Sequence, residues 1–278
     1  MKKYAVIGHP IGHSMSPFIH GRLFSLSGID YQYNALDIDP SLLDSEISSL
    51  KELSGFNVTI PHKETIIKYL DDIDESAKRY GAVNCVSNKN GKLYGCSTDA
   101  YGFSAALKYG GVLLEGKVLV LGCGGAARTI AREAADNGCA VTVAALKSSA
   151  RKANSLVNWI TDAGGKAASV DIAEIKGDFD LLVNATPVGM YPKTDAMAIT
   201  KEQLSNCKAV FDAVYNPAKT LLIKTAEALG IKTVGGMPML VWQAVKAHEF
   251  WYDGSFNKQD IKELVTDADK KMTEIFSK

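Results

Sequence analysis

A glycine-rich turn between an apolar run and an alanine-rich helical pattern constrains this chain more than any other feature. Residues 118–121 read V-L-V-L, as expected of a strand that is buried on both faces of a parallel sheet. Gly122, Gly124 and Gly125 follow at once, and alanines then recur at helical spacing until Gly138. The segment predicts a strand, a tight turn and a helix in direct succession.

The same turn indicates a binding site for a dinucleotide. Residues 122–127 read G-C-G-G-A-A, and Ala127 takes the place of the third small residue of the dinucleotide fingerprint. Glycines let backbone N–H groups approach a pyrophosphate, and the positive end of the helix dipole faces it. A glycine-rich turn that binds nothing is the alternative, but the flanking strand and helix favour the dinucleotide site.

The order of patterns along the chain predicts an α/β protein with two domains. From residue 117 onward, apolar runs alternate with helical patterns, as in a doubly wound, Rossmann-type domain. The six runs are residues 118–121, 140–144, 167–170, 181–185, 209–213 and 232–234. Two later helical patterns, at 240–252 and 258–276, fall outside this unit and are expected to pack back on the first domain.

The N-terminal third also alternates between strand and helix patterns, which predicts a mainly parallel sheet of its own. Asn90-Gly91 between two short strand patterns predicts a hairpin, and Gly110-Gly111 marks the approximate domain boundary. The other expected elements of this part are strands at 4–7, 31–38 and 55–60, and helices at 16–28, 39–53, 63–70 and 75–80.

Charge and hydropathy exclude several classes of partner. The 278 residues contain 31 Lys and Arg and 31 Asp and Glu, so no polyanion, nucleic acid or membrane surface is implied. The apolar segment at the N-terminus is too short for a signal peptide, and no run reaches membrane-spanning length. We expect a cytoplasmic protein that acts on a small molecule.

The cysteines and histidines predict neither disulfides nor a metal site. The five cysteines form no C-x-x-C pair and are interpreted as reduced thiols. Cys123, inside the glycine turn, is either a small filler or a reactive thiol at a helix N-terminus. His9, His13 and His20 lie close in sequence, but no carboxylate or Cys is spaced to join them as a ligand, so no metal is expected.

Two charged residues of the first domain are candidates for acid–base chemistry. Lys63 follows a strand that Pro61 ends, in the segment N-V-T-I-P-H-K. A lysine serves as a general acid or base when its surroundings tune it to that task, and the alternative is a solvated side chain at a helix start. Asp99 is the second candidate, and its alternative role is an N-cap for the following helix.

Neutral polar residues on several loops suit a polyhydroxylated substrate, because they offer both donors and acceptors. Ordinary turn and cap chemistry explains any one of them equally well. They are Ser14, Ser16, Thr59, Asn84 and Thr98.

Taken together, the polar motifs resemble those of the shikimate dehydrogenase family. Four of them look like its substrate domain: G-H-P-I-G-H-S-M-S-P (8–17), N-V-T-I-P-H-K (57–63), G-A-V-N (81–84) and S-T-D-A-Y-G (97–102). Four others look like its cofactor domain and closing helix: G-C-G-G-A-A, N-A-T-P-V-G-M (184–190), D-A-V-Y-N-P (212–217) and G-G-M-P-M-L-V-W-Q-A (235–244). The match covers nearly the whole chain, in order.

The resemblance implies the reversible reduction of 3-dehydroshikimate to shikimate with NADPH, a step toward aromatic amino acids. It makes Lys63 and Asp99 the catalytic pair, with Lys63 as the proton-transfer group. It implies substrate contacts by Ser14, Ser16, Thr59, Asn84, Tyr215 and Gln243. It implies cofactor contacts by Gly122, Gly124, Gly125, Ala126, Ala127, Asn184, Thr186, Gly236 and Met239. It also implies a discontinuous substrate domain, residues 1–100 with 237–278, around a Rossmann domain of residues 101–236.

One departure from the family bears on the cofactor. After the second strand the family shows Asn-Arg-Thr, whose Arg binds the 2′-phosphate of NADP, but residues 144–151 read A-A-L-K-S-S-A-R. The segment also lacks the acidic residue that an NAD site uses on the ribose. Lys147, Ser148 and Arg151 provide cations and a hydroxyl for a phosphate. We therefore expect NADP, with NAD as the alternative.

Two rival functions remain open. One is a quinate/shikimate dehydrogenase of the same superfamily that uses NAD, and the serines of S-M-S favour shikimate over quinate. The other is a non-catalytic protein that senses a dinucleotide, against which Lys63 and Asp99 argue. A monomer and a homodimer are both compatible with the sequence.

Overall fold

The computed structural model describes residues 1–12 and 14–276. It divides into two compact units, Met1–Gly102 with Val241–Ala268, and Phe103–Leu240 with Asp269–Lys278. Three helices contain residues of both units: α4 (Asp99–Tyr109), α9 (Gly236–Tyr252) and α10 (Lys258–Phe276).

The first unit contains a six-stranded sheet in the order β2-β1-β3-β5-β6-β4. The pairs β1·β2, β1·β3 and β4·β6 are parallel, while β3·β5 and β5·β6 are antiparallel, so the expected mainly parallel sheet is confirmed. Its strands are β1 (Lys2–Gly8), β2 (Tyr31–Asp37), β3 (Gly55–Val58), β4 (Asp72–Ile73), β5 (Cys85–Lys89) and β6 (Lys92–Cys96). The helices are α1 (Ser16–Leu26), α2 (Leu43–Leu50), the 3₁₀ helix η1 (Thr65–Tyr69) and α3 (Glu75–Tyr80).

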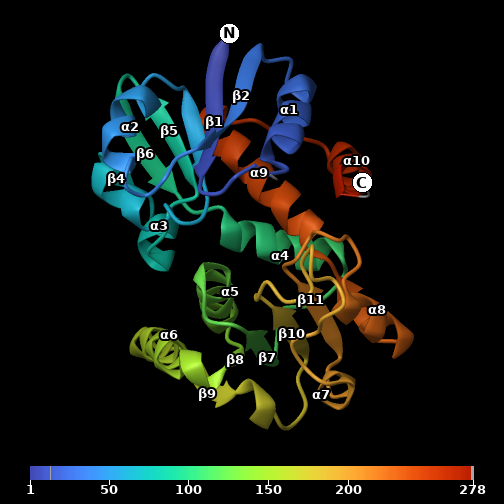
Figure 1. Ribbon diagram of the computed structural model, residues 1–278. Coiled ribbons are helices and arrows are strands. Elements are labelled where there is room, and N and C mark those ends of the chain that lie inside the picture. The colour runs from blue at the N-terminus through green and yellow to red at the C-terminus, as the bar shows by residue number, and fades with distance from the viewer. Residues whose placement is uncertain (13, 277–278) are drawn as a thin grey trace. The chain divides into compact units, whose positions relative to one another are not determined.

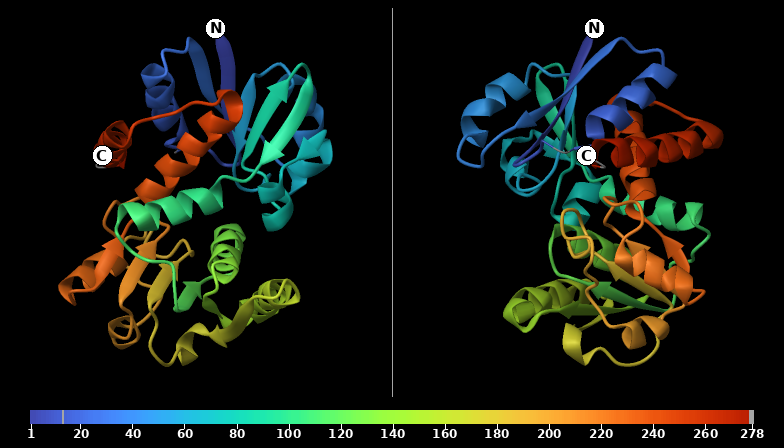
Figure 2. Two further views of the ribbon diagram at one scale, coloured as in Figure 1. Left: turned by 180° about the vertical axis from the view of Figure 1, so that it is seen from behind. Right: turned by 45° about the vertical axis from the view of Figure 1, so that its right-hand side comes forward.

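Helices cover both faces of this sheet (Figures 1 and 2). Successive residues of a strand point to opposite faces, so neighbouring residues of β1 are buried in two different cores. Ala5 and Ile7 of β1 face a core shared with α2, η1 and α3. Tyr4 and Val6 face the opposite core, which includes Phe24 of α1 and residues of α9.

The predicted hairpin is confirmed between β5 and β6, where Lys89 pairs with Lys92. Asn90 and Gly91 have φ values of 55° and 83°, as a two-residue hairpin turn of the primed type requires.

Two local predictions in this unit were wrong. The segment expected as a helix at 63–70 is the short 3₁₀ helix η1, and the two-residue strand β4 that follows it was not predicted. The expected helix 39–53 is only Leu43–Leu50, because the Asp39 carboxylate accepts hydrogen bonds from the backbone N–H and hydroxyl of Ser41 and holds a turn there.

The second unit contains the predicted doubly wound sheet, with all six strands parallel in the order β12-β11-β10-β7-β8-β9. Its strands are β7 (Lys117–Leu121), β8 (Ala140–Ala145), β9 (Lys166–Asp171), β10 (Leu181–Asn184), β11 (Ala209–Asp212) and β12 (Lys232–Val234). Its helices are α5 (Gly125–Asp136), η2 (Lys147–Ser149), α6 (Ala150–Asp162), η3 (Ile172–Glu174), α7 (Lys201–Ser205) and α8 (Leu221–Ala228).

The V-L-V-L run of β7 is buried on both faces, as its composition predicts. Val118 and Val120 pack in a core with α5 and α6, whereas Leu119 and Leu121 pack in a second core with α7 and α8. The carboxyl end of β7 leads through the glycine turn directly into α5, so the turn lies at the edge of the sheet where doubly wound folds bind ligands.

The C-terminal helices pack back on the first unit as far as Ala268. The Trp251 indole N–H of α9 donates to the Val86 carbonyl of β5 over 2.9 Å, and Arg22 of α1 pairs with Asp267 of α10. From Asp269 onward, the described residues of α10 belong to the second unit. A helix of 19 residues is about 28 Å long, so its two ends need not pack on the same unit. Within residues 1–12 and 14–276, no helix has the length and apolar character needed to span a membrane.

Candidate active site

Lys63 and Asp99, the two candidates for acid–base chemistry, form an ion pair in the first unit. The Lys63 Nζ donates to Asp99 Oδ2 over 2.5 Å, and the side chains are 28% and 15% exposed. Lys63 follows β3 after Pro61, and Asp99 is the first residue of α4. In the described structure the Asp99 carboxylate accepts from the side chains of Lys63 and Asn84, not from the N–H groups of its own helix. The geometry therefore favours the acid–base interpretation over the N-cap interpretation.

Asn84 connects this pair to the rest of the site. Its Nδ2 donates to Asp99 Oδ1 over 2.9 Å and lies 3.1 Å from Gln243 Oε1 and 3.0 Å from Thr98 Oγ1. Its Oδ1 accepts from the Thr98 backbone N–H over 2.7 Å. Asn84 is 3% exposed, so this amide fixes the Asp99 carboxylate from a buried position and leaves Lys63 at the partly exposed side.

Tyr33 and Asn57 form a buried polar pair next to Asn84 that the sequence analysis missed. The Tyr33 hydroxyl donates to Asn57 Oδ1 over 2.7 Å, and Asn57 Nδ2 lies 3.3 Å from the Asn84 carbonyl oxygen. Asn57 is a buried amide within the otherwise apolar strand β3, and that contrast was the signal available in the sequence.

The other residues that the resemblance assigns to the substrate are not hydrogen-bonded to this cluster in the described structure. The Ser14 Oγ accepts from the Ser16 backbone N–H over 3.2 Å, which is local turn chemistry. The Thr59 methyl group lies so close to Gly8 that a β-carbon there would be 2.5 Å from it. Tyr215 belongs to the second unit, and burial raises the pKa of its hydroxyl.

A cavity of about 580 Å³ opens at the carboxyl ends of β7, β8 and β10 in the second unit. Gly122 adopts a φ of +103°, and a β-carbon on Gly124 or Gly125 would meet no atom within 4 Å. The bare backbone at the start of α5 therefore fits a pyrophosphate group. The lining residues are Gly122, Cys123, Gly124, Ala144, Ala145, Leu146, Ser149, Lys152, Ile172, Ala185, Thr186, Pro187, Val188, Met197 and Ala198.

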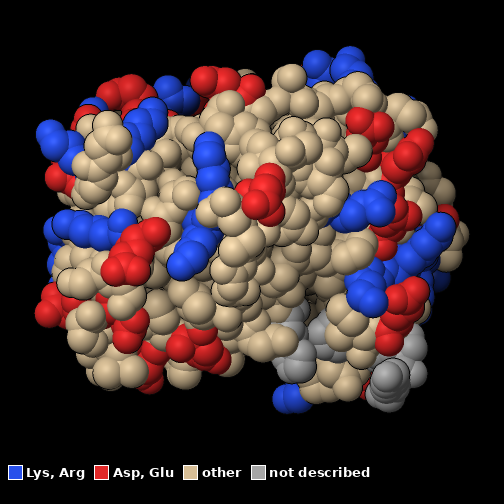
Figure 3. Space-filling view, turned by 90° about the horizontal axis from the view of Figure 1, so that it is seen from above, with Lys and Arg blue, Asp and Glu red and all other residues tan. Residues whose placement is uncertain are grey.

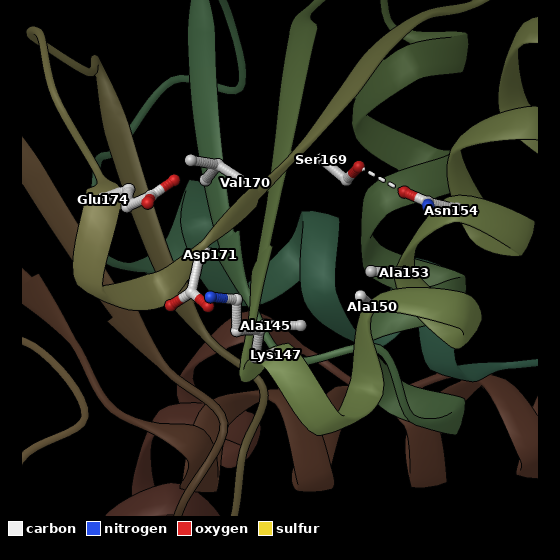
Figure 4. A pocket seen from close by; sticks show the side chains of 9 residues that line it. All are labelled: Ala145, Lys147, Ala150, Ala153, Asn154, Ser169, Val170, Asp171 and Glu174. Carbon is white, nitrogen blue, oxygen red and sulfur yellow. Dashed lines mark hydrogen bonds between the residues drawn. The ribbon is translucent and has the colours of Figure 1, made fainter.

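Lys152 is the charged residue in this lining, and it was not among the predicted phosphate ligands. Lys147 instead lines a second pocket of about 150 Å³ together with Asp171 and Glu174 (Figure 4). Ser148 and Arg151 line neither of these two cavities. Lys152 lies in the first turn of α6, and only the rotation of that helix against the sheet decides which of its side chains face the cavity.

The remaining expected cofactor residues have different environments. Gly125 and Ala126 begin α5, while Ala127 is fully buried in the core, where a small residue allows close packing of helix and strand. A β-carbon at Gly236 would lie 2.5 Å from the Ala213 carbonyl oxygen, and Met239 packs against the same core as Ala127. None of Ala127, Gly236 and Met239 is among the residues that line the cavity.

Asn184, expected at the cofactor, is 1% exposed and does not line the cavity itself, but it is hydrogen-bonded to Thr186, which does. The Asn184 Oδ1 accepts from both the backbone N–H and the hydroxyl of Thr186, over 3.1 and 2.7 Å. Its Nδ2 donates to the buried carboxylate of Asp212 over 2.9 Å.

Two of the three N-terminal histidines, His9 and His20, contact other side chains. The His9 Nδ1 lies 2.6 Å from Asp37 Oδ1, and the His20 Nδ1 lies 2.9 Å from His248 Nε2. His13 lies outside the described residues. Among the described residues, no three His, Cys, Asp or Glu side chains are grouped so that they could hold a metal ion. Cys123 lines the cavity, with its Sγ 4.0 Å from the Ser149 carbonyl oxygen.

Comparison with known proteins identifies the family. A family model described as the shikimate dehydrogenase substrate binding domain matches residues 6–86. A shikimate dehydrogenase (NADP(+)) from Caldanaerobacter subterraneus subsp. tengcongensis is 37% identical over 270 residues, which cover 95% of this chain and 96% of the relative.

Two solved structures extend the likeness to the fold. The shikimate 5-dehydrogenase of Thermus thermophilus, in complex with NADP(H) and shikimate, has a TM-score of 0.87 and 34% identity over 96% of this chain and 100% of that protein. The shikimate 5-dehydrogenase of Listeria monocytogenes, in complex with shikimate and NAD, has a TM-score of 0.84 and 34% identity over 95% of this chain and 96% of that protein. Since relatives of 34–37% identity cover 95–96% of this chain and nearly all of their own length, the chain belongs to the shikimate dehydrogenase family.

Proposed function

We propose that this chain is a shikimate dehydrogenase that interconverts 3-dehydroshikimate and shikimate with NADP, in the pathway to chorismate and the aromatic amino acids. The observation that carries the proposal is the 2.5 Å ion pair of Lys63 and Asp99. It occurs in a chain that also has a dinucleotide-type cavity and whose relatives bear that activity in their names.

Lys63 is proposed as the proton-transfer group. The bound cofactor supplies hydride from C4 of its nicotinamide to the carbonyl carbon. As negative charge develops on the carbonyl oxygen, the Lys63 ammonium donates a proton to it, and in the reverse direction the amine takes the hydroxyl proton back. The carboxylate of Asp99 holds the ammonium in place and stabilises its charge.

Asn84 and Gln243 are proposed to bind the hydroxyl groups of the substrate, together with Ser14, Ser16, Thr59 and Tyr215. Asn84 and Gln243 are amides in the same hydrogen-bonded cluster as Asp99, so a substrate at Lys63 meets both donors and acceptors there. The first unit is thus proposed as the substrate domain and the second as the NADP domain, near the boundaries 1–100 with 237–278 and 101–236.

The cavity of the second unit supports NADP. Backbone N–H groups of the glycine turn and the start of α5 are proposed to bind the pyrophosphate. Lys152 and Ser149 are the better candidates for the 2′-phosphate, because Lys147 shares its pocket with two carboxylates. The lining of the cavity includes no acidic residue for the ribose of NAD.

The partners are proposed to be small molecules, with the chain a monomer or a homodimer. Acidic and basic side chains are interspersed over the face shown in Figure 3. The whole sequence contains 31 Lys and Arg and 31 Asp and Glu. Such a surface does not attract polyanions. The five free cysteines are compatible with a reducing compartment, so we propose the cytoplasm.

Identification of the product tests the proposal. The purified chain is incubated with 3-dehydroshikimate and NADPH, and the product is separated by chromatography and compared with authentic shikimate. Formation of shikimate is expected. In parallel, quinate with NAD is offered as substrate, and turnover of that pair in preference to shikimate with NADP would assign the chain to the quinate-using branch instead.

A further inference from the structure

Asp212 is a buried carboxylate to which the proposed reaction gives no role. It ends β11 and is 0% exposed. Its Oδ1 accepts from Asn184 Nδ2 over 2.9 Å and from the Val214 backbone N–H over 3.0 Å, and its Oδ2 accepts from the Thr220 hydroxyl over 2.6 Å. Three donors converge on it, which suits the ionised form that only accepts.

The charge of Asp212 is not compensated by a neighbouring cation. All of the hydrogen-bond partners just named are neutral, and no Lys or Arg in the described part of the chain forms an ion pair with it. Burial raises the pKa of this carboxyl, and the three hydrogen bonds oppose that rise. Burying a charge costs free energy, and here hydrogen bonds offset that cost without a paired cation. The role of this carboxylate is therefore expected at the cavity.

A chain of hydrogen bonds joins Asp212 to the wall of the cavity. Asn184 donates to Asp212 and accepts from both polar groups of Thr186. The Thr186 hydroxyl in turn accepts from the Val188 backbone N–H over 3.2 Å, and residues 185–188 line the cavity. Asp212 therefore fixes Asn184, and Asn184 fixes this part of the wall.

The position of these residues in the sheet indicates which end of the cofactor they face. In a doubly wound fold the pyrophosphate binds at the first glycine turn, and the adenosine ribose lies toward the strand that follows it in sequence, here β8. The nicotinamide half then lies toward β10 and β11, which end at Asn184 and Asp212. Thr186 is next to the turn, because a β-carbon on Gly122 would lie 3.0 Å from its methyl group.

We infer that Asp212 is a positioning residue that presents a fixed negative charge to the nicotinamide end of the cavity, by way of Asn184 and Thr186, and thereby favours oxidised NADP⁺ over NADPH. The inference rests on the proposed function. The oxidised ring carries a formal positive charge that the reduced ring lacks, while the rest of the two molecules is the same. Stabilising the oxidised ring also shifts the equilibrium on the enzyme toward the alcohol, shikimate.

The substitution Asp212→Asn tests the charge with little change of shape. The dissociation constants of NADP⁺ and NADPH are measured separately by calorimetry on the full chain without substrate, and thermal melting of the cofactor-free protein checks the fold. The ratio of Kd for NADP⁺ to Kd for NADPH should rise about threefold to tenfold in the variant, as expected for the loss of one partly shielded charge interaction. Asp180→Asn is the matched control, because Asp180 precedes β10 at the other end of the strand, and it should leave the ratio unchanged.

The outcomes separate the inference from the proposed function. An equal loss of affinity for both cofactors in Asp212→Asn, or no change in either, would show a structural role only and overturn the inference. If that variant does not fold, the wild type still decides, because the inference requires it to bind NADP⁺ more tightly than NADPH. Failure of the wild type to bind either cofactor would contradict the proposed function, and the inference with it.

Discussion

The Nζ atom of Lys63 lies 2.5 Å from the Oδ2 atom of Asp99, although the two residues are 36 positions apart in the sequence. Asn84 holds the other carboxylate oxygen over 2.9 Å, so the lysine meets an acceptor that is itself fixed. This arrangement places a proton donor at a partly exposed point of the first unit, with neutral amides around it.

Replacement of Lys63 by alanine should lower kcat by about a hundredfold or more, with a smaller change in KM, because general acid–base catalysis is lost. Steady-state rates of shikimate oxidation measure both constants. Lys68→Ala is the matched control, since Lys68 lies on η1 and is exposed, and it should leave both constants unchanged. A variant at Lys63 that keeps most of its kcat while KM rises would make Lys63 a binding residue only.

Asp99→Asn should lower kcat by about tenfold or more, because an amide NH₂ group then faces the Lys63 ammonium or the Asn84 amide in place of an acceptor. The same kinetic assay measures this loss, and the melting temperature shows whether the fold is intact. Unchanged kcat in a folded Asp99→Asn protein would mean that the ion pair only stabilises the structure.

Lys152→Ala should weaken the binding of NADP⁺ by about tenfold to a hundredfold and leave the binding of NAD⁺ unchanged, because a charge-assisted hydrogen bond to the 2′-phosphate is lost. Titration calorimetry with each cofactor gives the comparison. Lys147→Ala should have the smaller effect, since Lys147 lines the pocket that contains Asp171 and Glu174. A larger loss of NADP⁺ affinity in Lys147→Ala than in Lys152→Ala would instead assign the 2′-phosphate to Lys147.

The stability of the chain should fall with pH below about 6.5 because of two buried histidines. Burial lowers the pKa of His248 to about 3, and burial together with neighbouring His248 lowers the pKa of His20 well below its ordinary value. The unfolded chain therefore binds protons that the folded chain excludes. The stabilisation is fully present above pH 6.5 and is lost as the pH falls toward 3, with a slope of up to about 1.4 kcal/mol per pH unit for each histidine.

Urea unfolding at pH 7 and pH 5 measures this dependence, and His248→Gln supplies the comparison. The variant is less stable at pH 7, because the contacts of His248 with His20 and Tyr252 are lost, but its free energy of unfolding should change less between the two pH values. An identical change in both proteins would exclude His248 as a source of the effect.

The fold was predictable from local patterns to a large extent. The V-L-V-L run, the glycine turn and the alternation of apolar runs with helices indicated the parallel sheet of the second unit, because these features depend only on neighbouring residues. The hairpin at Asn90-Gly91 was predictable for the same reason. The 3₁₀ helix η1 and the strand β4 were not, since segments of five and two residues carry too little periodicity to distinguish them.

The parts of the site that the sequence analysis missed depend on contacts between distant residues. Asp212 bonds to Asn184, 28 residues away, and Tyr33 bonds to Asn57, 24 residues away. Lys152 was missed for another reason: Arg151 and Lys152 are neighbours on α6 and are equally plausible phosphate ligands until the rotation of that helix is known. Lys63 and Asp99 were acid–base candidates from their positions in the sequence, and the family resemblance gave their roles as a pair. The structure adds the hydrogen bond that joins them.

The most direct test of the central claim is the rate of NADP⁺ reduction by the purified chain with shikimate as the only alcohol. NAD⁺ with shikimate, and NADP⁺ with quinate, run beside it under the same conditions. The account predicts rapid turnover with NADP⁺ and shikimate. It predicts a kcat/KM lower by at least about tenfold with NAD⁺ and shikimate, since NAD⁺ lacks the 2′-phosphate and one charge-assisted contact is lost. It also predicts a lower kcat/KM with NADP⁺ and quinate. Turnover with NAD⁺ or quinate that equals or exceeds it would contradict the assignment of cofactor or substrate, and no turnover with any pair would contradict the proposal that this chain is an enzyme.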